Sequence, residues 1–369
     1  MKGRIGLLIL TVSLLLSGCG FSEGSYVSVT PHREQRQSQQ LDAVTVANYQ
    51  ELIEALKQVV ASGQESAVLY VPDYPADTVE TGVDVAFRHV KYSDPVGAYA
   101  VEDIRCELGS SGSVPALAVT VRYRRSQAEL RQIQDAKTMD DVQTLVGRAL
   151  EQFAAGIVML VEEYQERDLT QFVQDFAAAN PQKVMEVPQV TETVYGSGRG
   201  RVVELVFGYQ NSRDDLRKMQ SQVKPVFDSA ALYVSGDGAQ RQKYAQLYGF
   251  LMERFDYKVE TSLTPAYSLL CHGVGDSRAF ATVYAAMCRG ADLTCLTVTG
   301  TCSGEPRTWN IVREGEQYYH VDLLRCSALG SYSTFTDRQM EGYVWDYSAY
   351  PACVGAEHGT PEVSEEETP

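Results

Sequence analysis

The spacing of apolar residues in the last third of the chain predicts two amphipathic helices. From 237 to 257, apolar positions recur every three or four residues, which is typical of a helix with one buried face. A second stripe of the same period runs from 278 to 289. Asp276 or Ser277 precedes this stripe and offers a side-chain oxygen to the exposed N–H groups of a first helical turn, and Gly290 ends it. The pattern therefore predicts a second helix that is capped by one of these two residues.

Three strands are predicted to follow that second helix. Residues 293–301 are rich in β-branched side chains, and the strand-like segments 308–313 and 317–324 flank a short turn that contains Gly315. Two extended segments around such a turn indicate a β-hairpin. A helix N-terminus that faces a small antiparallel sheet suits a nucleophile, because exposed N–H groups and the helix dipole favour negative charge there.

The middle of the chain, about 46–225, contains two copies of one pattern. Residues 116–134 align with 202–220 at an offset of 86, and residues 48–71 align with 138–161 at an offset of 90. Each copy predicts a helix, a strand, a second helix and two further strands. We therefore predict an α+β fold in which two repeated modules, each of roughly ninety residues, precede the C-terminal domain.

Local signals agree with this repeat. Ser126 and Ser212 occupy matching places, and each is predicted to N-cap the helix that follows it. The Gly-rich segment 196–200 lies between two strand-like runs and lacks the Lys-Ser/Thr of a phosphate-binding loop, so it predicts a hairpin turn. Neither module shows a catalytic constellation. We expect the modules to bind a partner or to orient the last domain.

The N-terminus has the features of an export signal. Lys2 and Arg4 precede an apolar run over 5–16, which is too short for a membrane span and is typical of a signal peptide. The run ends in Leu-Ser-Gly-Cys, which resembles the lipobox of bacterial lipoproteins. This resemblance implies cleavage before Cys19 and acylation of Cys19, with palmitate as the expected lipid. An uncleaved anchor or a soluble secreted protein are the alternatives.

The composition of the chain excludes two classes of binding partner. The formal net charge of -16 and the pI of about 4.8 exclude nucleic acid and a polybasic membrane-binding face as expected partners. Residues 20–41 are rich in Ser, Gln and Gly and predict a flexible tether, whereas 357–369 are acidic and predict a disordered tail. The cysteines have no paired C-x-x-C spacing and the histidines are scattered, so neither a metal site nor a cofactor is predicted.

Seven cysteines remain when Cys19 is set aside, and an odd number predicts at least one free thiol. Six of the seven lie in the last hundred residues, where one or two disulfides are plausible, although the spacing does not determine the pairing. The seven are Cys106, Cys271, Cys288, Cys295, Cys302, Cys326 and Cys353.

The stretch from Tyr267 to Cys326 resembles a transglutaminase-like domain of the papain-like superfamily, and the resemblance extends over about residues 240–350. The family has a nucleophilic cysteine at a helix N-terminus, a histidine on the next strand and an aspartate on the strand after that. The matching positions in Gly-Asp-Ser-Arg-Ala-Phe-Ala, Arg-Thr-Trp-Asn and Tyr-Tyr-His-Val-Asp are Ser277, Arg307 and Asp322.

Two of these three positions are replaced, and both replacements remove chemistry. A serine hydroxyl is a weak nucleophile unless a base takes its proton, and an arginine offers only hydrogen-bond donors, so Arg307 cannot be that base. We therefore expect a catalytically inactive domain in which an Arg307–Asp322 ion pair replaces the histidine–aspartate hydrogen bond. The resemblance also implies a groove lined by Ser277, Arg307, Trp309 and Asn310 that accepts an extended chain.

An active enzyme is the alternative. His320 lies two residues before Asp322, so on a strand both side chains point to one face, and His320 becomes a possible substitute base for Ser277. Such a protein would be a hydrolase or an acyl transferase with an atypical serine nucleophile. Cys271, which is followed by a histidine, is a further candidate nucleophile, but nothing in its segment prepares a thiolate.

Together these observations predict a lipoprotein held in a cell membrane by Cys19, on the extracytoplasmic face. Its expected ligands are peptides or cell-envelope components, and other surface proteins are further candidate partners. The predicted parts are a signal peptide (1–18), a lipidated tether (19–45), module 1 (46–137), module 2 (138–225), a transglutaminase-like domain (226–352) and an acidic tail (353–369).

Overall fold

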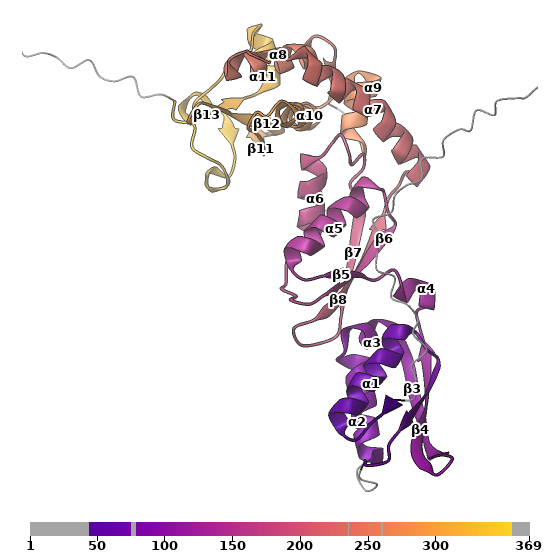
Figure 1. Ribbon diagram of the computed structural model, residues 1–369. Coiled ribbons are helices and arrows are strands. Elements are labelled where there is room, and N and C mark those ends of the chain that lie inside the picture. Colours follow the sequence, from indigo (N-terminus) through magenta and orange to yellow (C-terminus); the bar gives the residue numbers. More distant parts are fainter. Residues whose placement is uncertain (1–43, 75–78, 235, 260, 356–369) are drawn as a thin grey trace, which may run out of the picture. The chain divides into compact units, whose positions relative to one another are not determined.

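The computed structural model describes residues 44–74, 79–234, 236–259 and 261–355. They form a mixed α+β structure with three four-stranded sheets and one two-stranded sheet (Figure 1). The predicted signal peptide and nearly all of the predicted tether and acidic tail lie outside the described residues. Within the described part, no helix combines the length and the apolar character that a membrane crossing requires.

The first module is a sheet of order β1-β2-β4-β3 with helices packed on it. Strand β1 pairs with β2 in parallel, whereas β4 is antiparallel to both β2 and β3. The elements are β1 (Val44–Thr45), α1 (Tyr49–Ser62), β2 (Ser66–Tyr70), α2 (Val79–Tyr92), α3 (Pro95–Ala100), β3 (Val101–Ser111), β4 (Val114–Tyr123) and the short α4 (Gln127–Leu130).

The second module repeats this topology, with order β5-β6-β8-β7 and a parallel β5–β6 pair. Ser126 and Ser212 both act as N-caps, and each accepts a hydrogen bond from the N–H of the third residue after it, as predicted. The turn over 196–200 joins β7 to β8, with positive φ at Gly196 and Gly198. The elements are β5 (Gln134–Ala136), α5 (Met139–Glu151), β6 (Gly156–Val161), α6 (Leu169–Ala179), β7 (Gln189–Tyr195) and β8 (Arg201–Gly208).

Both ends of the predicted first module need correction. Val44–Thr45, assigned to the tether, form β1, and Gln134–Ala136, assigned to module 1, form β5 of the second sheet. These strands of two and three residues are too short to show a periodic pattern. Only their pairing with β2 and β6 assigns each to its sheet.

The C-terminal domain begins earlier than predicted. The predicted boundary at 225 falls inside α7 (Arg213–Tyr233), and the buried residues of this helix belong to the core of the last domain. The helices that follow are α8 (Gln240–Met252), α9 (Pro265–His272), α10 (Ser277–Gly290) and α11 (Leu323–Leu329). The strands are β9 (Asp256–Tyr257), β10 (Val274–Gly275), β11 (Cys295–Cys302), β12 (Glu305–Glu314), β13 (Gln317–Val321) and β14 (Tyr343–Val344), with short 3-10 helices at Asp337–Gln339 (η1) and Tyr347–Ala349 (η2).

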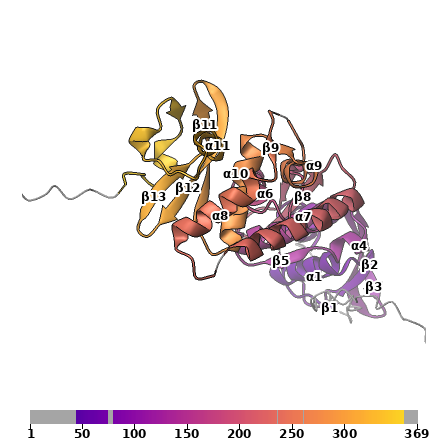
Figure 2. The same ribbon diagram turned by 90° about the horizontal axis from the view of Figure 1, so that it is seen from above.

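Helix α10 lies at the centre of this domain. It packs on β11 and β12 and also contacts α7, α8 and α9 (Figure 2). Ten of its fourteen residues are buried, which explains its largely apolar sequence. The cap is Asp276, whose carboxylate accepts the N–H of Ala279, so Ser277 is the first helical residue and not the cap.

The hairpin of β12 and β13 turns at Gly315, as predicted. The second strand, however, ends at Val321 and not at Leu324. Asp322 N-caps α11, because its carboxylate accepts the N–H groups of Leu324 and Arg325. This capping turns the chain into a helix directly after β13, where the sequence pattern alone had indicated three more strand residues.

Candidate functional site

The three positions that match the family's triad lie together at the N-terminal end of α10. Ser277 is 9% exposed, and its Oγ accepts the backbone N–H of Thr308 on β12 at 3.2 Å. A backbone N–H can donate a proton to the hydroxyl but cannot remove one. The contact therefore joins the start of α10 to the sheet and does nothing to activate the hydroxyl.

Arg307 and Asp322 form a bidentate ion pair. Nε of Arg307 donates to Oδ2 of Asp322 at 2.8 Å, and Nη2 donates to Oδ1 at 2.9 Å. Burial lowers the pKa of Arg307, but the hydrogen bonds and the charge of Asp322 more than offset this, so the pKa is raised above its ordinary value. The guanidinium stays charged, and the ion pair predicted from the sequence is present.

Asp322 has no capacity left for an imidazole. Besides the two donors of Arg307, it accepts the hydroxyl of Tyr343 at 2.6 Å and the N–H groups of Leu324 and Arg325 at 3.0 and 3.3 Å. A carboxylate has about four lone-pair sites, and here five donors share them. The Asp322 side chain is 1% exposed, so its carboxylate is shielded from solvent.

Trp309 and Asn310 do not line a groove, which corrects the role expected for them. Both are 0% exposed. Nδ2 of Asn310 donates to the carbonyl of Ala281 on α10 at 2.9 Å and to that of Leu296 on β11 at 3.2 Å. Asn310 therefore links the helix to the sheet, and Trp309 fills the core behind β12. Their Trp-Asn sequence reflects packing here, because side chains with no exposed surface cannot touch a ligand.

His320 is committed to other partners. Its Nδ1 accepts the indole N–H of Trp309 at 3.0 Å, and its Nε2 lies 2.8 Å from Oδ1 of Asp337. The ring is fully buried and also contacts Trp345 edge to face, with ring centroids 4.8 Å apart. Both ring nitrogens are therefore in use, and neither is bonded to Ser277 or Asp322. The structure does not assemble the triad of Ser277, His320 and Asp322.

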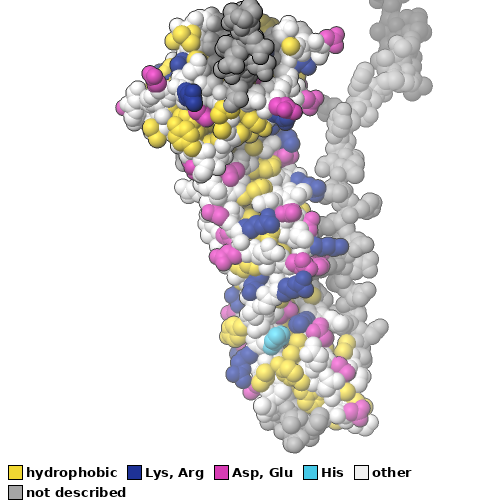
Figure 3. Space-filling view, turned by 90° about the vertical axis from the view of Figure 1, so that its left-hand side faces the viewer, with side chains coloured by type: hydrophobic (Ala, Val, Ile, Leu, Met, Phe, Trp, Pro, Cys, Tyr) yellow, Lys and Arg dark blue, Asp and Glu magenta, His cyan; other side chains and the backbone are white. Residues whose placement is uncertain are grey.

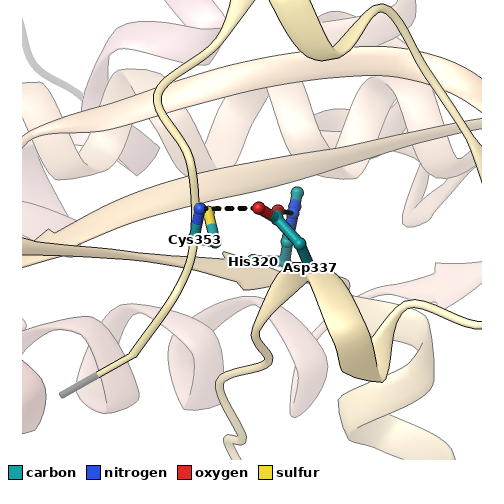
Figure 4. Close-up of side chains that lie close together, drawn as sticks. All are labelled: His320, Asp337 and Cys353. Atoms are coloured by element: carbon teal, nitrogen blue, oxygen red, sulfur yellow. Dashed lines mark hydrogen bonds and ion pairs between the residues drawn. The ribbon is translucent and has the colours of Figure 1, made fainter. Parts of the chain in front are cut away.

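His320, Asp337 and Cys353 form a compact group whose potential metal-ligating atoms lie within 4.8 Å of one another (Figure 4). The tautomer of His320 argues against a metal. An indole N–H only donates, so Nδ1 must be unprotonated, and Nε2 then carries the proton that it donates to Asp337. A metal on Nε2 would require an imidazolate.

The thiol of Cys353 also argues against a metal. Burial and then the charge of Asp337 raise its pKa to about 12, whereas a cysteine binds a metal as the thiolate. Oδ2 of Asp337 accepts the backbone N–H of Cys353 at 3.0 Å. The group is therefore a hydrogen-bonded clasp between β13 and the last described residues of the domain.

Acid should weaken this clasp. Burial lowers the pKa of His320, and the attraction of Asp337 only partly offsets that effect. A folded-state pKa below the unfolded value of about 6.5 means that the contribution to stability is complete above that pH and is lost as the pH falls through the folded pKa. We expect the free energy of unfolding to fall from pH 6.5 to 5.5 in urea titrations. The loss should be smaller in His320→Gln; equal pH slopes in the two proteins would contradict this assignment.

Cys271 lies in the last turn of α9, and its thiol is exposed. The C-terminal end of a helix dipole is negative and disfavours a thiolate. This residue is therefore poorly placed to be a nucleophile. All seven cysteines in the described part of the chain are thiols in this structure.

Sequence reasoning missed Tyr343, Asp337 and Trp345. They come from an irregular stretch after α11, where no periodic pattern marks them. The only signal for them in the sequence was the pair of aromatic residues, Tyr343 and Trp345, that follows Asp322.

Residues 228–349 match the model of the transglutaminase-like superfamily. The fold search found a crystal structure of a TGase, with 9% identity, covering 58% of this chain and 63% of that one, at a TM-score of 0.26. It also found a provisionally named cysteine protease from Cytophaga hutchinsonii, with 13% identity, 40% and 65% coverage and a TM-score of 0.25.

A provisionally named protease from Parabacteroides distasonis matches with 8% identity, 75% and 44% coverage and a TM-score of 0.23. The chain spans less than two thirds of the length of each of these three structures. No curated protein matches the chain. The family match over 228–349 therefore carries the assignment of the last domain, and likenesses this distant say nothing about its activity.

Proposed function

Residues 228–349 form a transglutaminase-like domain, and from this premise we propose that the chain is a membrane-anchored extracytoplasmic lipoprotein whose domain binds ligands without converting them. The ligand class is a peptide or a cell-envelope component. The anchor rests on the Leu-Ser-Gly-Cys sequence that ends at Cys19. Several acyl chains on one cysteine would hold the protein firmly, because each buried CH₂ contributes about 0.8 kcal/mol.

The observation that carries the loss of catalysis is the Arg307–Asp322 pair. General-base catalysis needs a group that accepts a proton near neutral pH, and the residue next to Ser277 in the triad arrangement is a permanent cation. The remaining acceptor, Asp322, is saturated by donors. In this proposal Ser277, which accepts the N–H of Thr308 and has an arginine at the position of the family's base, is a binding feature and not a nucleophile.

The same cation indicates the charge of the ligand. The ion pair uses Nε and Nη2 of Arg307, which leaves Nη1 outside the bidentate contact. The side chain retains 18% exposure. A carboxylate-bearing ligand fits a guanidinium with an N–H group outside the ion pair, because charged N–H donors bind carboxylates well. Peptides with acidic side chains or free C-termini, and envelope glycopeptides, have this chemistry.

The distribution of charged side chains on one face of the protein also supports attachment through a lipid. On the face shown in Figure 3, Lys and Arg side chains are interspersed with Asp and Glu side chains. A mixed surface of this kind gives little electrostatic attraction to anionic lipids, which requires clustered basic residues. We therefore propose that Cys19, and not a basic patch on this face, provides the membrane attachment.

The test is a turnover assay by mass spectrometry on the full-length protein in detergent. The substrates are glutamine-bearing peptides with amine donors, and peptidoglycan fragments. We expect no product that depends on Ser277, and we expect Ser277→Ala to retain the same ligands as the parent in a pull-down of this mixture. Ser268→Ala, at another buried serine of the domain, is the matched control. Products made by the parent and by Ser268→Ala, but absent with Ser277→Ala, would establish Ser277 as a nucleophile and refute the proposal.

A further inference from the structure

A groove of about 300 Å³ lies between α2 and β3 of the first module, two elements that are labelled in Figure 1. The residues that α2 contributes are at positions 84, 87, 88, 91 and 92, and these intervals place them on one face of the helix. Strand β3 contributes Asp103 and Ile104. None of these residues belongs to the site around Ser277, so the groove is a separate feature of the first module.

Strand β3 is an open edge of its sheet. In the order β1-β2-β4-β3 it pairs with β4 alone, and from Asp103 to Ser111 this pairing runs without a bulge. Along an edge strand, every second residue directs its backbone N–H and C=O away from the sheet. No strand in the described part of the chain pairs with these outward groups. Because α2 packs beside β3, an extended segment that paired with this edge would run along the groove.

The groove holds two cations that form no ion pair within the described residues. Nε of Arg88 donates to a backbone carbonyl one turn earlier in α2 at 3.4 Å, and Nζ of Lys91 lies 5.3 Å from the centroid of the Tyr92 ring. Of the two carboxylates in the lining, that of Asp103 is already paired with Arg105 at 3.0 Å. When Arg105 is counted, three cations meet two carboxylates, which leaves one positive charge in a chain whose formal charge is -16. The groove therefore favours an acidic ligand.

The duplication identifies the surface of the second module that corresponds to this groove. The offset of 86 that aligns β4 with β8 also aligns the ends of α2 and α6. In both modules the turn after this helix contains the same backbone hydrogen bond, from the N–H of Ala98 to the carbonyl of Asp94 in the first and at the matching positions in the second. Residues 91–92 of the groove therefore correspond to residues 177–178.

In the second module this surface is used for docking. Residues 177–178 line a small cavity together with residues of α9 and α10 from the last domain. Next to them, the carbonyl of Ala179 accepts a hydrogen bond from the guanidinium of Arg289 on α10. The first module has Lys91 and Tyr92 in place of two alanines, and Tyr92 is 62% exposed. One copy of the fold therefore uses this surface to hold another part of the chain, whereas the other copy presents it open and charged.

We propose that the groove between α2 and β3 binds an extended acidic peptide segment, which adds to the edge of β3 as a further strand. The backbone of the segment pairs with the outward N–H and C=O groups of β3. Its alternate side chains are about 6.6 Å apart, and residues one turn apart on a helix are separated by about 5–6 Å. Two alternate carboxylates can therefore reach Arg88 and Lys91, while Phe87 and Tyr92 offer apolar contacts. This site is additional to the one around Ser277 and does not depend on the loss of catalysis there.

The test is the binding of a fluorescein-labelled peptide of alternating glutamate and valine to the full-length protein in detergent, measured by fluorescence anisotropy. The double variant Arg88→Glu with Lys91→Glu should weaken binding by about tenfold or more, because two charge-assisted contacts become repulsive. The matched control, Arg217→Glu with Lys218→Glu, makes the same change of charge at two exposed residues of α7 and should bind as the parent does. A peptide with lysine in place of glutamate should bind far more weakly than the acidic peptide.

Amide hydrogen exchange tests the pairing with β3 separately from the charge. Saturation with the acidic peptide should slow exchange in fragments from 102–111 and leave β7, the corresponding edge strand of the second sheet, unchanged. The proposal would be overturned if the parent did not bind the acidic peptide, if both double variants lost binding equally, or if binding left exchange in β3 unchanged. Slow exchange in β3 that required no peptide and rose with protein concentration would identify a second copy of the chain as the occupant, which would also overturn it.

Discussion

Substitution of Asp322 by alanine is expected to destabilise the C-terminal domain by about 3–5 kcal/mol, because it leaves the mostly buried guanidinium of Arg307 without its counter-ion. The same change also deprives the hydroxyl of Tyr343 and the first N–H groups of α11 of their acceptor. Each buried donor left unsatisfied adds to the cost. In a working enzyme, by contrast, a catalytic aspartate is expected to affect turnover more than stability.

The measurement is urea unfolding of the full-length protein, followed by tryptophan fluorescence. Both tryptophans of the chain, Trp309 and Trp345, lie in this domain. A Tm lower by about 10 °C is the corresponding thermal result. The double variant Arg307→Met with Asp322→Leu is the matched control. It removes both charges and should be more stable than Asp322→Ala, since replacing a whole buried pair by apolar residues is often close to neutral.

A small effect of Asp322→Ala on stability would contradict this prediction. If Asp322→Ala unfolded within 1 kcal/mol of the parent, the ion pair would not hold the site together. The explanation of the lost triad as a structural replacement would then fail, even if no turnover were found.

The second large effect concerns location. Replacement of Cys19 by alanine is expected to move the protein from the membrane fraction to the soluble fraction almost completely, or to leave an unprocessed precursor. The reason is that the proposed acylation needs the thiol of Cys19. Among the described residues, no helix is long and apolar enough to cross a membrane. Cell fractionation with immunoblotting and an intact mass of the N-terminal peptide would measure both outcomes.

Cys271→Ala is the control, because it removes an exposed thiol that has no expected lipid. It should fractionate as the parent does. If Cys19→Ala remained in the membrane fraction with an unchanged N-terminal mass, the lipoprotein assignment would be refuted. The domain, for which we propose ligand binding without turnover, would then need a different cellular placement.

Several parts of this protein were determined by short stretches of sequence. The helix α10, the hairpin of β12 and β13 and the caps at Ser126 and Ser212 follow from apolar spacing and turn chemistry within a few residues. The duplicated topology followed from the same pattern at two offsets. The replacement of the family's cysteine and histidine is likewise readable in the sequence, because it concerns residue identity alone.

Other features were decided only by tertiary contacts. The partner of Asp322 on β14 lies 21 residues away, and the partner of His320 on η1 lies 17 residues away, in a stretch without periodicity. Alternation along a strand predicted that His320 and Asp322 would share a face, but it could not predict which groups would reach His320 first. For the same reason it could not predict that Trp309 and Asn310 would be buried.

The sequence by itself therefore determined which local elements form and which residues stand at the positions predicted to match the triad, since both can be read from neighbouring residues. Only the tertiary structure decided that Asp322 is saturated and that His320 belongs to a clasp with Asp337 and Cys353. These are statements about which donor, acceptor or thiol lies opposite another. They depend on long-range packing, which residue spacing does not encode.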